Sequence, residues 1–169
     1  MAIEDYVREN INAFGEYTSY HDKDFNDQLQ GGQPFRKEME EDMIKLSRQF
    51  LRARGADEQT IDRCKLGYWY SMYYAGQDHH LHTHPCAKVA GTYYPYANER
   101  SSTIRFRNPS NTIIQHAENW SDKSHYTEHH HQPVSGDMLV WPCWLEHEVR
   151  IEKNVKSGEE RIAISWNYQ

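Results

Sequence analysis

The sequence predicts a mainly β protein, built as a sandwich, barrel or jelly roll, with helices confined to its first third. Aromatic residues, which pack well on pleated sheets, make up 13% of the chain. From residue 66 onward short apolar runs alternate with turn-forming residues, whereas before residue 64 apolar residues recur at helical spacing. A length of 169 residues suits one domain, 1–169, with a helical part at 1–64 and a jelly-roll core at 65–169.

The clearest helix is predicted at residues 35–54. Gly55 suits the C-terminal end of this helix, and Asp57 suits the N-terminal cap of a short second helix. Residues 1–34 are weakly patterned and predict one short helix. The apolar residues of the 35–54 helix recur at steps of three and four; they are Met39, Met43, Leu46 and Phe50.

Short strands are predicted along the rest of the chain. Several strands at this spacing are typical of a sandwich, barrel or jelly roll. Between them, residues 111–133 are polar and rich in histidine, and we expect a long loop over one mouth of the barrel. The strand-like runs are LGYWYSMYYAG, KVAGTYYPY, STIRFRNP, GDMLVWP, HEVRIE and ERIAISWN.

The net charge and the cysteine content indicate which binding partners and which cellular compartment to expect. The formal net charge of −6 gives no electrostatic basis for binding nucleic acid or an anionic membrane, so we expect neither partner. The three cysteines are widely spaced and odd in number, which does not fit a disulfide framework. The acidic N-terminus lacks the features of a signal peptide. We therefore expect a soluble, cytoplasmic protein.

The stretch HHLHTHP at residues 79–85 suggests a metal site. His82 and His84 stand at i and i+2, so on a strand both rings lie on the same face. A third ligand must come from a distant strand, and His147 in GDMLVWPCWLEHEV is the candidate. Three ligands on one face leave positions open for oxygen chemistry at iron. A solvated surface cluster would show the same pattern, and a register with His80 and His82 satisfies the same spacing.

Arg161 heads the apolar strand RIAISWN. Inside a barrel, its guanidinium would need an anionic partner, because a buried unpaired charge is very costly. Its planar fork matches a carboxylate in a bidentate fashion. The sequence leaves two interpretations open: a carboxylate-binding group in a pocket, or an ion pair at the start of a strand, with partners among Glu146, Glu148 and Glu152.

Five motifs follow one another between about Leu66 and Asn167: HTHP, AGTYY, IRFRNP, GDMLVWPCWLEH and RIAISWN. In this order they resemble the motifs of the 2-oxoglutarate- and Fe(II)-dependent dioxygenases, and within them the small oxygenases of marine bacteria and their phages. The resemblance implies a double-stranded β-helix, the cupin-like jelly roll, buttressed by the N-terminal helices. It also implies Fe(II) as metal, 2-oxoglutarate as co-substrate, and hydroxylation of a small-molecule or peptidyl substrate with release of succinate and CO2.

The resemblance assigns roles to individual residues. His82, His84 and His147 would bind the metal, and Arg161 would bind the distal carboxylate of 2-oxoglutarate. Aromatic or hydroxyl residues on neighbouring strands would share that carboxylate. The candidates for this sharing role are Tyr70, Ser71, Tyr73 and Tyr93, and further residues expected to line the co-substrate pocket, on the same face as Arg161, are Ser165 and Asn167.

Two departures from the family pattern leave alternatives open. His84 stands where the family usually has a carboxylate ligand, and Ala163 stands where many members have a serine. A cupin-like three-histidine dioxygenase or isomerase that needs no 2-oxoglutarate is therefore the second hypothesis. A non-catalytic barrel that binds a metal or ligand is the third. The pattern also allows a homodimer formed through the N-terminal helix.

A second histidine cluster, HYTEHHH, spans residues 125–131. We expect a solvated loop near the barrel mouth, with a separate zinc or nickel site as the alternative. His116 and Trp120 would belong to the same lid, and His21, His79 and His80 are expected at the surface.

Overall fold

The computed structural model describes residues 3–14, 18–20, 35–73, 78–110, 127–150 and 160–169. Helix α1 spans Ile3–Phe14, α3 spans Arg36–Ala53 and α4 spans Glu58–Arg63. No helix in these ranges combines the length and the apolar composition that crossing a bilayer requires. The eight strands are β1 (Leu66–Tyr73), β2 (His79–His82), β3 (Val89–Tyr96), β4 (Ile104–Arg107), β5 (Glu128–His131), β6 (Met138–Pro142), β7 (His147–Val149) and β8 (Arg161–Tyr168).

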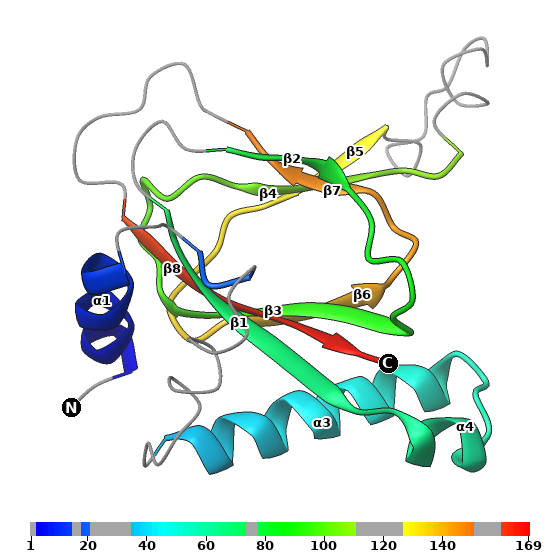
Figure 1. Cartoon of the computed structure of the whole chain (residues 1–169). Helices are drawn as coiled ribbons and strands as arrows, with labels where there is room; N and C mark the ends of the chain where they lie inside the picture. Colours follow the sequence, from blue (N-terminus) through cyan, green and yellow to red (C-terminus); the bar gives the residue numbers. More distant parts are fainter. Residues whose placement is uncertain (1–2, 15–17, 21–34, 74–77, 111–126, 151–159) are drawn as a thin grey trace, which may run out of the picture.

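The strands form two four-stranded antiparallel sheets, which face each other in Figure 1. The first sheet has the order β1-β8-β3-β6 and the second the order β2-β7-β4-β5. The chain changes sheet at every step except from β4 to β5. This topology is the double-stranded β-helix, or jelly roll, so the predicted fold class is confirmed.

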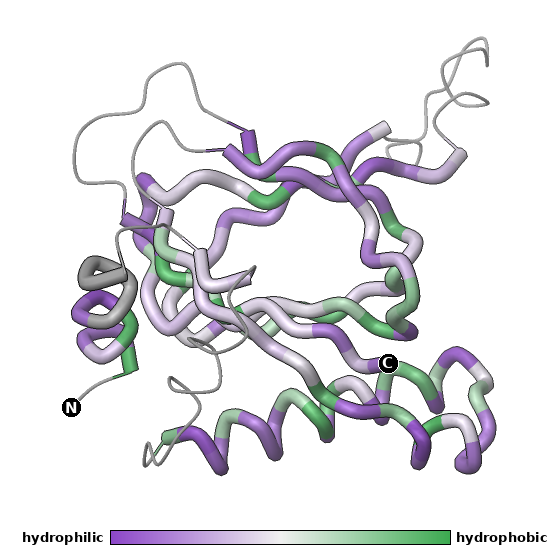
Figure 2. Tube along the Cα trace, in the orientation of Figure 1, coloured by the Kyte–Doolittle hydropathy of each residue, from purple (hydrophilic) through white to green (hydrophobic). Residues whose placement is uncertain are grey.

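Helix α3 covers the outer face of the first sheet (Figure 1). Hydrophobic and hydrophilic residues alternate along it with the helical repeat (Figure 2). The buried positions are Met39, Met43, Ser47 and Leu51. The predicted helix is confirmed, but its buried stripe turns toward Ser47 rather than Leu46, because the buried indole of Trp166 donates a hydrogen bond of 3.0 Å to Ser47 Oγ.

The predicted helix ends are also found. Gly55 has a φ of +84°, the left-handed conformation that ends many helices. The Asp57 side chain accepts a hydrogen bond of 2.8 Å from the backbone N–H of Thr60 and so caps α4.

Strand β8 runs through the centre of the first sheet, paired with β1 on one side and β3 on the other. Its side chains alternate between two environments. Ile162, Ile164 and Trp166 face the helices and join the largest apolar cluster. The other set, at positions 161, 163, 165 and 167, faces the space between the sheets. This alternation places Arg161 inside the barrel.

Part of the predicted His-rich loop is a strand. Residues 128–131 form β5 and pair with β4, from Ile104↔His131 to Arg107↔Glu128. The expectation of an irregular loop at 111–133 is therefore wrong for this part, while residues 111–126 lie outside the described ranges. The polar side chains of β5 gave no apolar alternation to mark it as a strand, because β5 is an edge strand of its sheet.

Candidate metal centre

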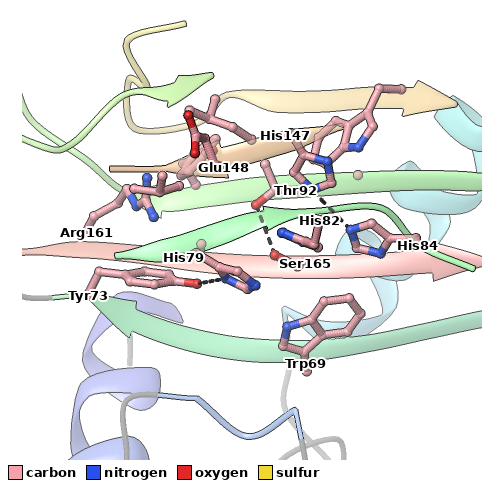
Figure 3. A pocket seen from close by; sticks show the side chains of 16 residues that line it. Trp69, Tyr73, His79, His82, His84, Thr92, His147, Glu148, Arg161 and Ser165 are labelled. Carbon is pink, nitrogen blue, oxygen red and sulfur yellow. Dashed lines mark hydrogen bonds between the residues drawn. The ribbon is translucent and has the colours of Figure 1, made fainter. Parts of the chain in front are cut away.

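Two histidines of one segment and a third from a distant strand meet between the sheets (Figure 3). His82 ends β2 and pairs with His147 on β7. His84 lies two residues beyond β2, where its backbone N–H donates to Cys143 O at 2.9 Å. One ligand nitrogen from each ring lies within 4.8 Å of the others, which is close enough to hold one metal ion. The predicted convergence is thus found, although only His82 of the H-x-H pair lies on a strand.

The Nδ1 atom of each ring faces a carbonyl-type oxygen. His82 Nδ1 lies 2.7 Å from His80 O, and His147 Nδ1 lies 2.9 Å from Leu145 O. His84 Nδ1 lies 2.6 Å from the amide oxygen of Asn167. Since these oxygens can only accept, each Nδ1 must carry the proton and donate it. Each neutral ring then keeps the lone pair of its Nε2 atom for a metal ion.

The separation of His84 Nε2 and His147 Nε2 is 3.2 Å. Two nitrogen ligands about 2.1 Å from one ion lie about 3.0 Å apart at a right angle and about 3.4 Å apart at a tetrahedral angle. The observed separation falls between these values. The two rings are also nearly parallel, with centroids 5.0 Å apart and an interplanar angle of 13°. The pair is therefore spaced as two ligands of one ion.

Burial keeps these histidines neutral. It lowers the pKa of His147 to about 3, with the neighbouring His82 as the next cause. Burial also lowers the pKa of His82 and of His84, against the opposing effect of their Nδ1 hydrogen bonds. Neutral imidazole is the form that binds metals, so at neutral pH all three rings are ready to act as ligands.

A fourth histidine lies in the same cavity. The ring of His79 stacks on His82, with centroids 4.2 Å apart and an angle of 17°. Its Nδ1 atom lies 2.9 Å from the hydroxyl of Tyr73, and burial lowers its pKa to about 4. The prediction that His79 lies at the surface is therefore wrong. His80, by contrast, has a side chain that is 92% exposed, which excludes the alternative register of His80 with His82.

Arg161 lies in the same cavity and is 2% exposed. Its Nη1 atom donates to Ser102 O at 3.0 Å, and its Nε atom has no hydrogen-bond partner within the described ranges. The guanidinium carbon lies over the ring of Tyr73 at 4.4 Å and that of Tyr94 at 5.7 Å. These rings hold the guanidinium plane but supply no counter-charge.

The carboxylates that could neutralise Arg161 have other partners. Glu146 pairs with Arg107 at 3.4 Å, and Glu148 pairs with Arg150. Glu152 lies outside the described ranges. Among the residues that the structure describes, no carboxylate lies within ion-pair distance of Arg161. The cavity thus holds a buried cation that is available to an anionic ligand.

The remaining predicted residues divide between the cavity and the outer face of the sheet. Tyr73 and Ser165 line the cavity, and Asn167 binds His84 at its edge. Tyr93 is not brought to the site. It packs on the helix side of the first sheet, because neighbouring positions on a strand face opposite ways, and Thr92 and Tyr94 face the cavity instead. The same alternation turns Tyr70 toward the helices.

Trp69 and Thr92, like His79 and Tyr94, are contributors to the site that went unrecognised in the sequence. Trp69 stacks on His84, with ring centroids 6.0 Å apart and an angle of 26°. Its position four residues before Tyr73 places both on one face of β1, a signal that could have identified it. Thr92 was missed for a different reason. It lines the cavity and accepts a hydrogen bond of 3.5 Å from Ser165 Oγ, a contact between strands that are distant in sequence.

The second histidine cluster forms no comparable site. His131 Nε2 lies 2.9 Å from Asp137 Oδ2, and His130 Nε2 lies 3.2 Å from Glu128 Oε2. Within the described ranges, the group of His82, His84 and His147 is the one set of three or more potential ligands close enough to hold an ion. Residues 125 and 126, as well as the predicted surface and lid residues His21, His116 and Trp120, lie outside these ranges.

Comparison of the sequence with protein families gives one match. The model of a family described as "Putative 2OG-Fe(II) oxygenase" matches residues 67–167, which is more than half of the chain. The match begins in β1 and ends at Asn167, so it includes all three histidines and Arg161. No curated protein matches the chain.

Several solved structures are similar to the chain at low sequence identity. An oxidoreductase of the 2OG-Fe(II) oxygenase family from Burkholderia pseudomallei is 12% identical, with a TM-score of 0.46, covering 63% of this chain and 46% of that one. A prolyl-4-hydroxylase from Pseudomonas putida is 17% identical, with a TM-score of 0.43 and coverages of 62% and 51%. HygX from Streptomyces hygroscopicus with nickel and 2-oxoglutarate bound is 14% identical, with a TM-score of 0.44 and coverages of 62% and 56%. The chain thus spans about half the length of these proteins.

Proposed function

The chain belongs to the family of 2OG-Fe(II) oxygenases, and from this premise we propose that it hydroxylates a small-molecule or peptidyl substrate with release of succinate and CO2. Fe(II) and 2-oxoglutarate are the cofactors of this family. One observation carries the proposal. The same cavity is lined by three histidines with free Nε2 lone pairs and by the buried guanidinium of Arg161, which has no carboxylate partner among the described residues.

The donor set fits Fe(II). Imidazole suits iron, and three protein ligands leave coordination positions open for a co-substrate and O2. The usual site of this kind has two histidines and one carboxylate. With His84 in place of the carboxylate, the bound ion keeps one more unit of positive charge. This charge favours an anionic chelating ligand such as a 2-oxo acid.

Arg161 fits the other end of a dicarboxylic co-substrate. Its Nε donor has no partner among the described residues, and Tyr73 and Tyr94 hold the guanidinium plane in place. A carboxylate would accept from the guanidinium and neutralise it at the same time. The hydroxyls of Thr92 and Ser165 lie between Arg161 and the histidines in Figure 3. Ala163 adds no hydroxyl, so these two replace the serine that many family members carry there.

When bound, Fe(II) supplies the activation of O2 that couples decarboxylation of 2-oxoglutarate to hydroxylation of a substrate. The protein holds the co-substrate and excludes bulk water. The cavity between the sheets has a volume of about 40 Å³, room for about three water molecules.

A second cavity, of about 270 Å³, supports the proposal of a separate substrate. It shares Trp69, His79, His82 and His84 with the inner cavity, but Arg161 does not line it. A substrate in it would lie next to the metal without displacing the co-substrate. Its other described lining residues are uncharged; they are Thr18, Tyr20, Thr83, Pro85 and Asn167.

The three-histidine ligand set also favours a second candidate, a cupin-like metal dioxygenase or isomerase that needs no 2-oxoglutarate. Such an enzyme would have no use for a buried cation facing the cavity. The available Arg161 guanidinium therefore supports the first proposal over the second.

We also propose a reducing, cytoplasmic setting, supported by the free thiols of the three cysteines.

The proposal is tested by anaerobic titration of the Fe(II)-loaded protein with 2-oxoglutarate. Chelation gives a weak visible charge-transfer band, which requires no knowledge of the substrate. We expect a saturable band in the wild type and in Arg107→Gln, a matched change at an arginine that pairs with Glu146. Arg161→Gln is expected to bind iron but to lose the band at the same 2-oxoglutarate concentrations. Iron binding without a band in the wild type would reject 2-oxoglutarate as co-substrate and favour the second candidate.

A further inference from the structure

The three ligand histidines are not oriented in the same way. His82 and His147 each donate from Nδ1 to the backbone carbonyl two residues earlier, at 2.7 and 2.9 Å. His84 donates instead to the side chain of Asn167, which is 83 positions away in the sequence. Among the three, His84 is thus the ligand whose orientation depends on a replaceable side chain.

His84 needs this partner because its own segment does not fix the ring. It lies beyond the end of β2, and the residues after it, Pro85 and Cys86, are exposed. Stacking against Trp69 restricts the plane of the ring. It does not decide which edge of the ring faces His147, because a half-turn of the ring about the Cβ–Cγ bond keeps the plane but exchanges Nδ1 with Cδ2 and Nε2 with Cε1. A hydrogen bond at one edge of the ring makes that choice.

Asn167 is well placed to make the hydrogen bond that sets the orientation of the His84 ring. It lies on β8 opposite Gly67 on β1 and Ala90 on β3, so its backbone is held by a strand on each side. Its amide oxygen reaches His84 Nδ1 at 2.6 Å. The amide is neutral. It therefore fixes the proton on Nδ1 without adding a negative charge next to the three-histidine centre.

We infer that Asn167 is a positioning residue of the metal centre: its amide oxygen holds His84 in the tautomer and orientation that turn Nε2 toward the ion. This inference rests on the proposed function, in that it takes His84 as a ligand. It also gives Asn167 a role different from the predicted contact with 2-oxoglutarate. A second hydrogen-bonding shell of this kind sets both ligand geometry and metal affinity.

The first test measures the affinity of the full chain for Ni(II), which binds histidine sites without reacting with O2, by calorimetry. Asn167→Leu removes the acceptor and is expected to weaken binding about 10- to 100-fold. Asn167→Asp keeps an acceptor oxygen and is expected to bind within about threefold of the wild type or tighter. Asn98→Leu is the control. It makes the same change at a turn outside the site, where Asn98 Oδ1 accepts a hydrogen bond from the N–H of Arg100. It is expected to leave the affinity for Ni(II) unchanged.

The second test reads the tautomer directly. In ¹⁵N-histidine-labelled protein loaded with Zn(II), His84 is expected to show a protonated Nδ1 and a metal-bound Nε2. A His84 ring protonated at Nε2, or Asn167→Leu binding Ni(II) as tightly as the wild type, would overturn the inference and leave the oxygenase proposal standing. A wild type that binds neither ion would reject the metal centre itself. The tautomer in the wild type decides the matter even if Asn167→Leu does not fold.

Discussion

The Nε2 atoms of His84 and His147 lie 3.2 Å apart, and neither carries a proton when both Nδ1 atoms donate to oxygen. Two lone pairs at this distance repel each other unless a cation lies between them. The folded chain therefore holds a small unfavourable interaction that a metal ion would relieve. Metal binding and stability should be coupled at this site.

We predict that Ni(II) stabilises the folded protein through the three histidines. A ligand at about one hundred times its Kd raises the free energy of unfolding by about 2.7 kcal/mol. His147→Ala should lose most of this gain, and EDTA should reverse it in the wild type. The measurement is urea unfolding with and without Ni(II). His130→Ala, an exposed histidine on β5, serves as the control; equal stabilisation of His147→Ala and the wild type would place the ion elsewhere.

The metal-free protein should lose stability in mild acid. Burial holds the pKa of folded His147 at about 3, below the value of about 6.5 in an unfolded chain. Because the unfolded state takes up the proton first, the contribution is complete above pH 6.5 and is lost as the pH falls from there toward 3. The slope is about 1.4 kcal/mol per pH unit, or about 2 kcal/mol between pH 6.5 and 5. Urea unfolding of the metal-free protein at several pH values measures it.

A matched variant separates His147 from the other titrating groups. His147→Gln keeps a polar side chain but cannot take up a proton, so its stability should fall less steeply over the same pH range. Identical slopes for His147→Gln and the wild type would mean that His147 is protonated in the folded state. His79, with a pKa of about 4, adds a second contribution of the same sign.

Arg161 should lower the stability of the ligand-free protein. A buried cation without a carboxylate partner among the described residues is costly, and an apolar residue of similar length removes this cost. We expect Arg161→Met to raise the free energy of unfolding by about 1 kcal/mol while 2-oxoglutarate binding is lost. Urea unfolding and the anaerobic titration measure the two effects. A large loss of stability would indicate that the guanidinium is already neutralised in the folded chain.

Most strands could be predicted because their signals are local. Apolar runs that end at turn residues predicted β1, β3, β4, β6, β7 and β8. The edge strand β5 carries polar side chains and gave no such signal. The facing of side chains was harder to predict where a strand is buried on both sides. Val89–Tyr96 is almost entirely buried, so nothing in its pattern distinguished Tyr93 from Tyr94, and Tyr93 was assigned to the wrong face.

The features of the site that depend on sequence motifs and on the alternation of side chains along a strand could be predicted. The H-x-H spacing predicted that the rings of His82 and His84 lie together, as the structure has them. For Arg161 the spacing left both a pocket position and a surface ion pair open, and the family resemblance favoured the pocket, where the structure places it. The partners of these residues depend on contacts between distant segments. Asn167 meets His84 because the end of β8 lies next to the segment that follows β2, a proximity that no local pattern contains. Ser47 is buried in α3 for the same kind of reason, its bond to Trp166.

The close packing of Gly91 against Trp166 gives a prediction about the sheet that carries the site. These residues are paired across β3 and β8, and a Cβ built on Gly91 would lie 2.2 Å from Cζ2 of the Trp166 ring. The ring is fully buried and held by its bond to Ser47, so it cannot move aside at low cost. We expect Gly91→Ala to lower the free energy of unfolding by about 2–3 kcal/mol. Gly67→Ala on β1, with no atom within 4 Å of the added Cβ, should change it by less than about 0.5 kcal/mol. Urea unfolding compares the two variants, and equal effects would mean that the ring does not lie over Gly91 in solution.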